Sequence, residues 1–294
     1  MKWLKGIGLL LIANVLIFVT LSITFHVLVN LILPAFGIDV RGAVSQEDLV
    51  WALVIGFGGA FLSLAFSKQF ARSMLSCTQI TQPRSPAEQV IYGAVQEIAQ
   101  RLHIKMPEVW VYESEDPNAF ATGPSKNNSM VAVSTGLLNN LNEQEVRAVL
   151  AHEMGHVYNG DMFTTTVLAG LMNTFVYFIS RWVYRHLAER NEALAFGIYI
   201  FLQMVLSFLA MIPISWFSRR REFAADAFSA RVYGRDAMIS ALQAIDRWVN
   251  RAQIEYGTQD ALATMKISGK STGFLHLFAT HPPVEERVAA LRRL

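Results

Sequence analysis

The segment AVLAHEMGHVYNGD, residues 148–161, carries two histidines four residues apart, with a glutamate directly after the first. Residues four apart project from the same face of a helix, so His152 and His156 can present two imidazoles to one metal ion. Glu153 lies about 100° around the helix from His152, from where its carboxylate can reach a metal-bound water. Zinc lowers the pKa of such a water from about 16 toward 7, and a nearby carboxylate can accept its proton. The spacing therefore predicts a hydrolytic zinc site with Glu153 as its base.

A catalytic zinc needs a third protein ligand and an open fourth position. Glu222 and Asp226, in EFAAD, are again four apart and lie on one face of a second predicted helix, with two alanines between them that permit close packing. One carboxylate can bind the metal and the other can accept the free ring N–H of a ligand histidine, although a surface ion pair with the preceding arginines is an alternative. Asp161 follows an Asn-Gly pair and is more typical of a turn. The candidates for the third ligand are Asp161, Glu222, Asp226, His276 and His281.

Capped helices and short strands are predicted around these residues. Ser85, Pro86 and Glu88 form a capping-box pattern at the start of one helix, and Asn142 with Glu145 forms another ahead of the histidine motif. We expect the metal helix to cover residues 136–157. Strands are predicted at 108–114, 118–123 and 129–136, and C-terminal helices at 220–232, 235–252 and 280–294.

Four stretches contain no Asp, Glu, Lys or Arg, and a membrane span needs about 20 mostly apolar residues. The chain is 53% hydrophobic and 16% charged, whereas about a quarter of the residues in ordinary soluble domains are charged. These stretches therefore predict membrane helices, although the last two could instead be buried core helices of a soluble enzyme. They cover residues 6–38, 49–67, 162–180 and 193–218.

We expect an α-rich α+β membrane protein with about four transmembrane helices and a zincin-like metallopeptidase domain that carries a small sheet. Lys and Arg after the second and fourth spans place this domain on the cytoplasmic side. Arg181, Arg185 and Arg190 stand against that orientation. The expected domains are an N-terminal transmembrane hairpin (1–67), two catalytic halves (68–161 and 219–294) and a second transmembrane hairpin (162–218).

The chain resembles the HtpX family of membrane zinc metallopeptidases in the order of its motifs: NAFATG, HEMGH, a hydrophobic hairpin, EFAAD and THPPVEER. This family is related to the CAAX-type prenyl-protein endopeptidases. The resemblance covers essentially the whole chain. It implies one zinc ion per chain bound by His152, His156 and Glu222, with Glu153 as base and Asp226 as an orienting residue. It also implies a cytoplasm-facing site in a bacterial inner membrane and a role in the quality control of damaged membrane proteins under stress.

Two flanking motifs are candidates for binding the substrate. Asn118, Ala119 and Phe120 fall in a predicted edge strand, to which an extended peptide can add; alternatively, Phe120 belongs to the core of a hairpin. The family resemblance supports the substrate-binding role. His281 and Arg287 could each donate to the oxyanion that develops on the scissile carbonyl, and the family pattern contains both. The alternative is a proline-stiffened helix start, with Arg287 in an ion pair.

The predicted function is that of a membrane-bound zinc endopeptidase acting on proteins or peptides. The main alternative is a membrane-bound chaperone-like or binding protein whose zinc is structural and fully enclosed by four ligands. A transporter predicts charged residues within the spans, which the four stretches lack. The net charge of +2 gives no reason to expect nucleic acid as a partner, and the single cysteine, Cys77, excludes an internal disulfide.

Overall fold

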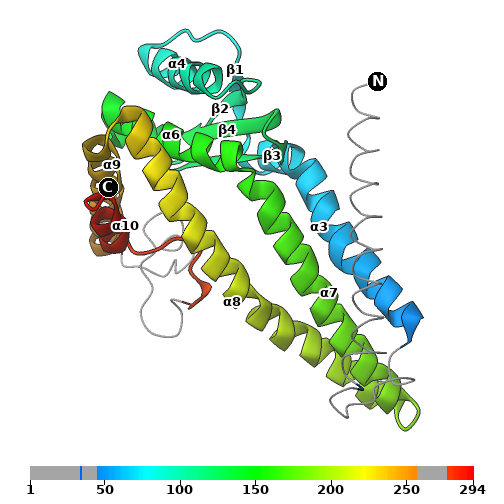
Figure 1. Cartoon of the computed structure of the whole chain (residues 1–294). Coiled ribbons are helices and arrows are strands. Elements are labelled where there is room, and N and C mark those ends of the chain that lie inside the picture. The colour runs from blue at the N-terminus through cyan, green and yellow to red at the C-terminus, as the bar shows by residue number, and fades with distance from the viewer. Residues whose placement is uncertain (1–33, 35–44, 257–276) are drawn as a thin grey trace, which may run out of the picture. The chain divides into compact units, whose positions relative to one another are not determined.

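The computed structural model describes Pro34 and residues 45–256 and 277–294 (Figure 1). The apolar stretch 6–38, apart from Pro34, and the candidate ligand His276 lie outside the described residues. The helices are α3 (Gln46–Leu75), α4 (Pro86–Arg101), α5 (Thr135–Asn140), α6 (Glu143–Asn159), α7 (Asp161–Ala188), α8 (Glu192–Tyr233), α9 (Arg235–Tyr256) and α10 (Val284–Leu291). The strands are β1 (Thr78–Ile80), β2 (Glu108–Tyr112), β3 (Ala119–Ser125) and β4 (Asn128–Ser134).

Three helices of the described part of the chain are long and apolar enough to cross a membrane, namely α3, α7 and α8. Their most apolar windows have mean hydropathies of 2.2, 1.5 and 2.2. They contain three of the four predicted stretches. The apolar stretch 193–218 and the EFAAD segment form one continuous helix of 42 residues, which contains Pro213 in its interior.

The chain divides into two compact units, and α3, α7 and α8 contribute residues to both. Unit 1 comprises residues 1–63 and 166–210. Within it, α3 packs closely on α7, since a Cβ on Gly56 would lie 2.3 Å from Thr174 Oγ1. Asp48 is buried and forms ion pairs with Arg185 and Arg181, so neither arginine is a free positive charge on this unit.

Unit 2 comprises residues 64–165 and 211–294 and contains a four-stranded sheet in the order β1-β2-β4-β3. β2 and β4 are parallel, the other pairs are antiparallel, and β3 is an edge strand. The three predicted strands correspond to β2, β3 and β4, whereas β1 has only three residues and no pattern that predicts it. The prediction of a single helix over 136–157 is wrong. This segment contains two helices, α5 and α6, because Asn142 adopts extended backbone angles and caps α6 together with Glu145.

Helix α6 runs through the core of unit 2, in contact with α4, α9 and β3. Small residues allow α8 to approach α6 on another side. The Ser229 hydroxyl of α8 donates to the Ala148 carbonyl at 2.6 Å, and a Cβ on Gly155 would lie 3.3 Å from the Cα of Ala225. This close approach brings the EFAAD segment of α8 against the histidine motif of α6.

Candidate active site

The structure brings His152, His156 and Glu222 together, although 66 residues separate the last two in the sequence. The two histidine Nε2 atoms lie 3.2 Å apart. Glu222 Oε1 is 3.2 Å from Nε2 of His156, and Oε2 is 3.4 Å from Nε2 of His152. Among the described residues, these three side chains form the group that could hold a metal ion.

The spacing of these atoms fits a zinc ion. Ligands at 2.0–2.1 Å in a tetrahedral site lie roughly 3.3–3.4 Å from one another. The separation of the two Nε2 atoms, and the distance from each of them to one of the two Glu222 oxygens, are close to this value. Two imidazole nitrogens and a carboxylate this close together, with His152 and Glu222 buried, also favour a positive charge between them for electrostatic reasons. The donor set of two imidazoles and one carboxylate is that of catalytic rather than structural zinc.

A carboxylate and an arginine fix the orientation of His152. The Nδ1–H of His152 donates to Asp226 Oδ1 at 2.9 Å, which leaves Nε2 free to bind a metal. The guanidinium of Arg287 holds the same carboxylate in two hydrogen bonds, of 2.6 and 2.8 Å. Arg287 is only 1% exposed, so this pair is shielded from water and salt.

His156 has a second set of partners of the same kind. Its Nδ1–H donates to Asp161 Oδ2 at 2.7 Å. The other oxygen of Asp161 accepts hydrogen bonds from the guanidinium of Arg221. His152 and His156 therefore each have a buried carboxylate as partner, and each carboxylate is paired with an arginine.

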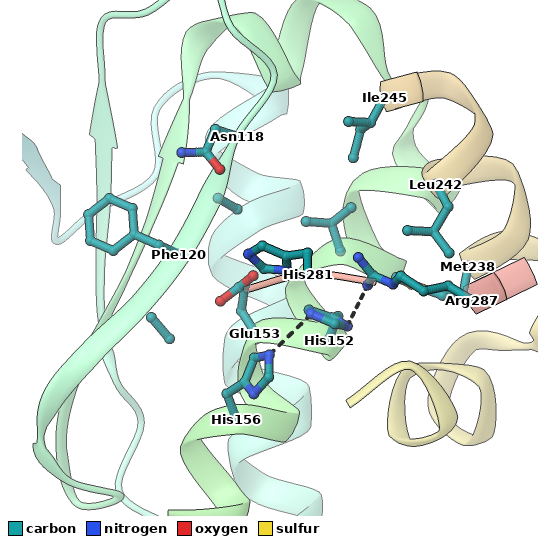
Figure 2. A pocket seen from close by; sticks show the side chains of 13 residues that line it. Asn118, Phe120, His152, Glu153, His156, Met238, Leu242, Ile245, His281 and Arg287 are labelled. Carbon is teal, nitrogen blue, oxygen red and sulfur yellow. Dashed lines mark hydrogen bonds between the residues drawn. The ribbon is translucent and has the colours of Figure 1, made fainter. Parts of the chain in front are cut away.

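Glu153 lines a cavity of about 280 Å³ together with both ligand histidines (Figure 2). Burial raises the pKa of Glu153, and the neighbouring histidines oppose this shift only in part. A buried carboxylate with a raised pKa is well suited to accept and return a proton.

The edge strand β3 and the residue before it, Asn118, form one wall of the cavity, to which Phe120 also contributes. The Asn118 amide donates to the Tyr112 hydroxyl at 3.0 Å, and the Phe120 ring packs against Tyr112 with centroids 5.9 Å apart. Ala119, which also lines the cavity, belongs to the core on the α6 side of the sheet. The Phe120 ring therefore lies on the sheet face away from α6, and the strand edge is what β3 presents to the cavity.

His281 and Arg287, both of which also line the cavity, differ in their surroundings. His281 is partly exposed, and its Nδ1 lies 2.7 Å from Glu222 Oε2. Arg287 is hydrogen-bonded to Asp226, and its NH1 atom lies 3.4 Å from the same oxygen of Glu222. Figure 2 shows the His281 ring between Glu153 and Arg287. Of the two, His281 is the side chain that can reach a bound substrate.

A model of peptidase family M48 matches residues 87–294. The chain belongs to peptidase family M48. This M48 peptidase is 44% identical to the protease HtpX of Pasteurella multocida (strain Pm70), over 96% of the chain and 98% of the relative. It is also 44% identical to the protease HtpX of Thioalkalivibrio sulfidiphilus (strain HL-EbGR7), over 99% of both. The expected family is thereby confirmed, and the chain is a membrane metallopeptidase.

The fold is similar to that of a solved structure, S. mikatae Ste24p, with a TM-score of 0.57 and 18% sequence identity. The similarity covers 83% of this chain and 56% of Ste24p. It confirms the expected fold class, a helical membrane protein with a small sheet in its peptidase domain. The alternative of a chaperone-like or binding protein is not favoured by these comparisons.

Three residues of the M48 site were missed or underrated from the sequence. Asp161 is typical of a turn in the sequence. Arg221 and Tyr112 have no pattern that marks them, because their partners lie 60 and 6 residues away in unrelated segments. For Asp161, its position five residues after His156, at the end of the motif helix, was the available indication.

Proposed function

We propose that this M48 peptidase is a zinc-dependent endopeptidase in which His152, His156 and Glu222 bind one zinc ion and Glu153 acts as the general base. The observation that carries the proposal is the convergence of the two histidine Nε2 atoms and the Glu222 carboxylate, at separations of 3.2–3.4 Å, beside a cavity bordered by an edge strand. An open cavity with three protein ligands is the arrangement of a catalytic rather than a structural zinc.

The zinc ion would supply Lewis-acid polarisation of the scissile carbonyl and a water that is reactive at neutral pH. Glu153 accepts a proton from the attacking water and returns it to the leaving amine. His281 donates a hydrogen bond to the developing oxyanion, while Arg287 acts through Asp226 rather than on the substrate. Asp226 keeps Nε2 of His152 directed at the metal.

The peptide would add in extended form to the free edge of β3, between Asn118 and Ala121. Facing that edge, α9 contributes Met238, Leu242 and Ile245 to the cavity wall. These side chains are apolar and offer no hydrogen-bonding group. We therefore propose that the cavity takes an apolar side chain next to the scissile bond, as expected for segments of membrane proteins.

Lys and Arg near the ends of the apolar segments support a cytoplasm-facing peptidase domain in a bacterial inner membrane. On the same proposal, the domain is formed by residues 68–161 and 219–294, with transmembrane hairpins at 1–67 and 162–218. The resemblance to HtpX proteases supports a role in removing damaged membrane proteins under stress.

Metal removal tests the proposed function directly. The purified full-length protein in detergent is expected to cleave an unfolded membrane protein, to lose this activity with 1,10-phenanthroline, and to regain it with zinc but not with magnesium. The Glu153→Gln protein from the same preparation controls for contaminating proteases. Cleavage that persists after the metal has been stripped would contradict the proposal.

Enlarging the apolar wall is expected to change which bonds are cut. In Leu242→Ala, the rate ratio for substrates with Phe rather than Val beside the scissile bond should rise about tenfold, the usual scale for methylene-sized changes in an apolar pocket. Ile239→Ala, on the same helix but outside the cavity lining, is the matched control. Mass spectrometry of the products gives the cut sites, and polar residues at most wild-type sites would refute an apolar preference.

A further inference from the structure

We infer that Asp161 is a positioning residue of the metal centre, which fixes the ring of His156 and is itself held by Arg221. The inference rests on the proposed function, because it assumes that His156 binds zinc through Nε2. Asp161 does not contact the metal position or the substrate cavity. It acts on the metal through His156.

Both carboxylate oxygens of Asp161 are used by groups outside its own helix. Oδ2 lies 2.7 Å from Nδ1 of His156, and Oδ1 accepts hydrogen bonds from Nε and NH2 of Arg221. An aspartate at the start of a helix ordinarily accepts from the first backbone N–H groups of that helix. Asp161 is the first residue of α7 and only 5% exposed, yet its carboxylate points toward α6, the helix that carries His156.

The turn between α6 and α7 places this carboxylate. Gly160 has left-handed backbone angles (φ 70°, ψ 32°), which end α6 four residues after His156. The next residue can then direct its side chain back along the last turn of α6. A residue with a Cβ would be strained at this φ, so glycine is required for the geometry that brings Asp161 to His156.

Arg221 connects this pair to the helix that carries the third ligand, because it precedes Glu222 directly in α8. One chain of contacts therefore joins His156, Asp161 and the segment that carries Glu222. Without Asp161, the Nδ1–H of His156 loses its acceptor and the ring loses its fixed tautomer and orientation. Removing such a carboxylate from a metal-binding histidine typically weakens metal affinity 10–100-fold.

The competing explanation is that Asp161 and Arg221 only form an ion pair that joins α7 to α8. Asp161→Asn separates the two explanations, because its amide oxygen can still accept from Nδ1–H of His156 while the charge that binds Arg221 is lost. A positioning role predicts that Asp161→Asn and Arg221→Ala, which both lose only the contact between residue 161 and Arg221, show the same small loss of zinc affinity, of about threefold. Asp161→Ala, which also loses the acceptor for His156, should lose 10–100-fold. An ion pair alone predicts the same thermal destabilisation in all three variants and unchanged zinc affinity.

The test is a zinc competition titration of the full-length protein in detergent against a chelator of known affinity. Cobalt substitution adds a second reading, since the visible absorption of the cobalt protein reports the orientation of its ligands. We expect the largest change of the cobalt spectrum in Asp161→Ala, and a smaller change of the same size in Asp161→Asn and Arg221→Ala. Asp236→Ala, at an aspartate whose side chain is 94% exposed, is the matched control.

Unchanged zinc affinity and cobalt spectrum in Asp161→Ala would overturn the inference and leave the proposed function intact. Failure of the wild-type protein to bind zinc, or zinc binding that survives loss of both ligand histidines, would instead overturn the proposed function. If Asp161→Ala does not fold, Arg221→Ala and Asp161→Asn decide the question. A positioning role predicts the same small loss of zinc affinity and the same altered cobalt spectrum in both, whereas an ion pair alone predicts that both readings stay at the wild-type value.

Discussion

Replacing Glu153 by glutamine is expected to leave the zinc bound and to lower kcat by about 10²–10⁴-fold, the usual contribution of a general base. Glutamine keeps the size and shape of the side chain but cannot accept a proton from water. Glu153 lines the cavity but is not one of the three converging ligands, so zinc content should stay at the wild-type value. The measurement is proteolysis under single-turnover conditions, with elemental analysis of the same sample.

The matched control for this substitution is Glu143→Gln, at an exposed glutamate in the first turn of the same helix. It makes the same chemical change outside the cavity and should leave kcat unchanged. A Glu153→Gln protein that cleaves its substrate at the wild-type rate would show that another group activates the water. A variant that loses zinc as well would place Glu153 among the ligands.

Replacing Glu222 by alanine is expected to remove the metal and with it all proteolysis. Glu222 is buried, and its two oxygens lie 3.4 and 3.2 Å from the Nε2 atoms of His152 and His156. Among the described residues it is the carboxylate grouped with both histidines. Two histidines alone bind zinc far more weakly than a three-ligand site. Zinc content after dialysis should fall close to zero, as measured by elemental analysis.

Asp226→Ala is the informative comparison for Glu222→Ala, because the two residues lie one helical turn apart on the same face of α8. Asp226 orients His152 without binding the metal, so its loss should weaken zinc affinity by about 10–100-fold and leave saturated zinc content unchanged. If Glu222→Ala retained as much zinc as the parent, the third ligand would have to be another residue.

The sequence alone determined the local chemistry of this protein. The spacing of His152 and His156, and again of Glu222 and Asp226, follows from the helical repeat, so each pair could be placed on one face of a helix without a structure. The starts of two helices, at Ser85 and Asn142, could also be predicted from the sequence, since a capping box involves residues only three apart. The apolar stretches in α3, α7 and α8 depend on composition and length alone.

Only the tertiary structure decided how these segments meet. Asp161 is typical of a turn in the sequence; its contact with His156 depends on the left-handed Gly160, and its contact with Arg221 depends on how α8 packs against α6. In the same way, Arg287 and His281 were equivalent candidates until the burial of Arg287 against Asp226 separated them. A contact between residues 60 or more positions apart depends on helix packing, which no local pattern in the sequence specifies.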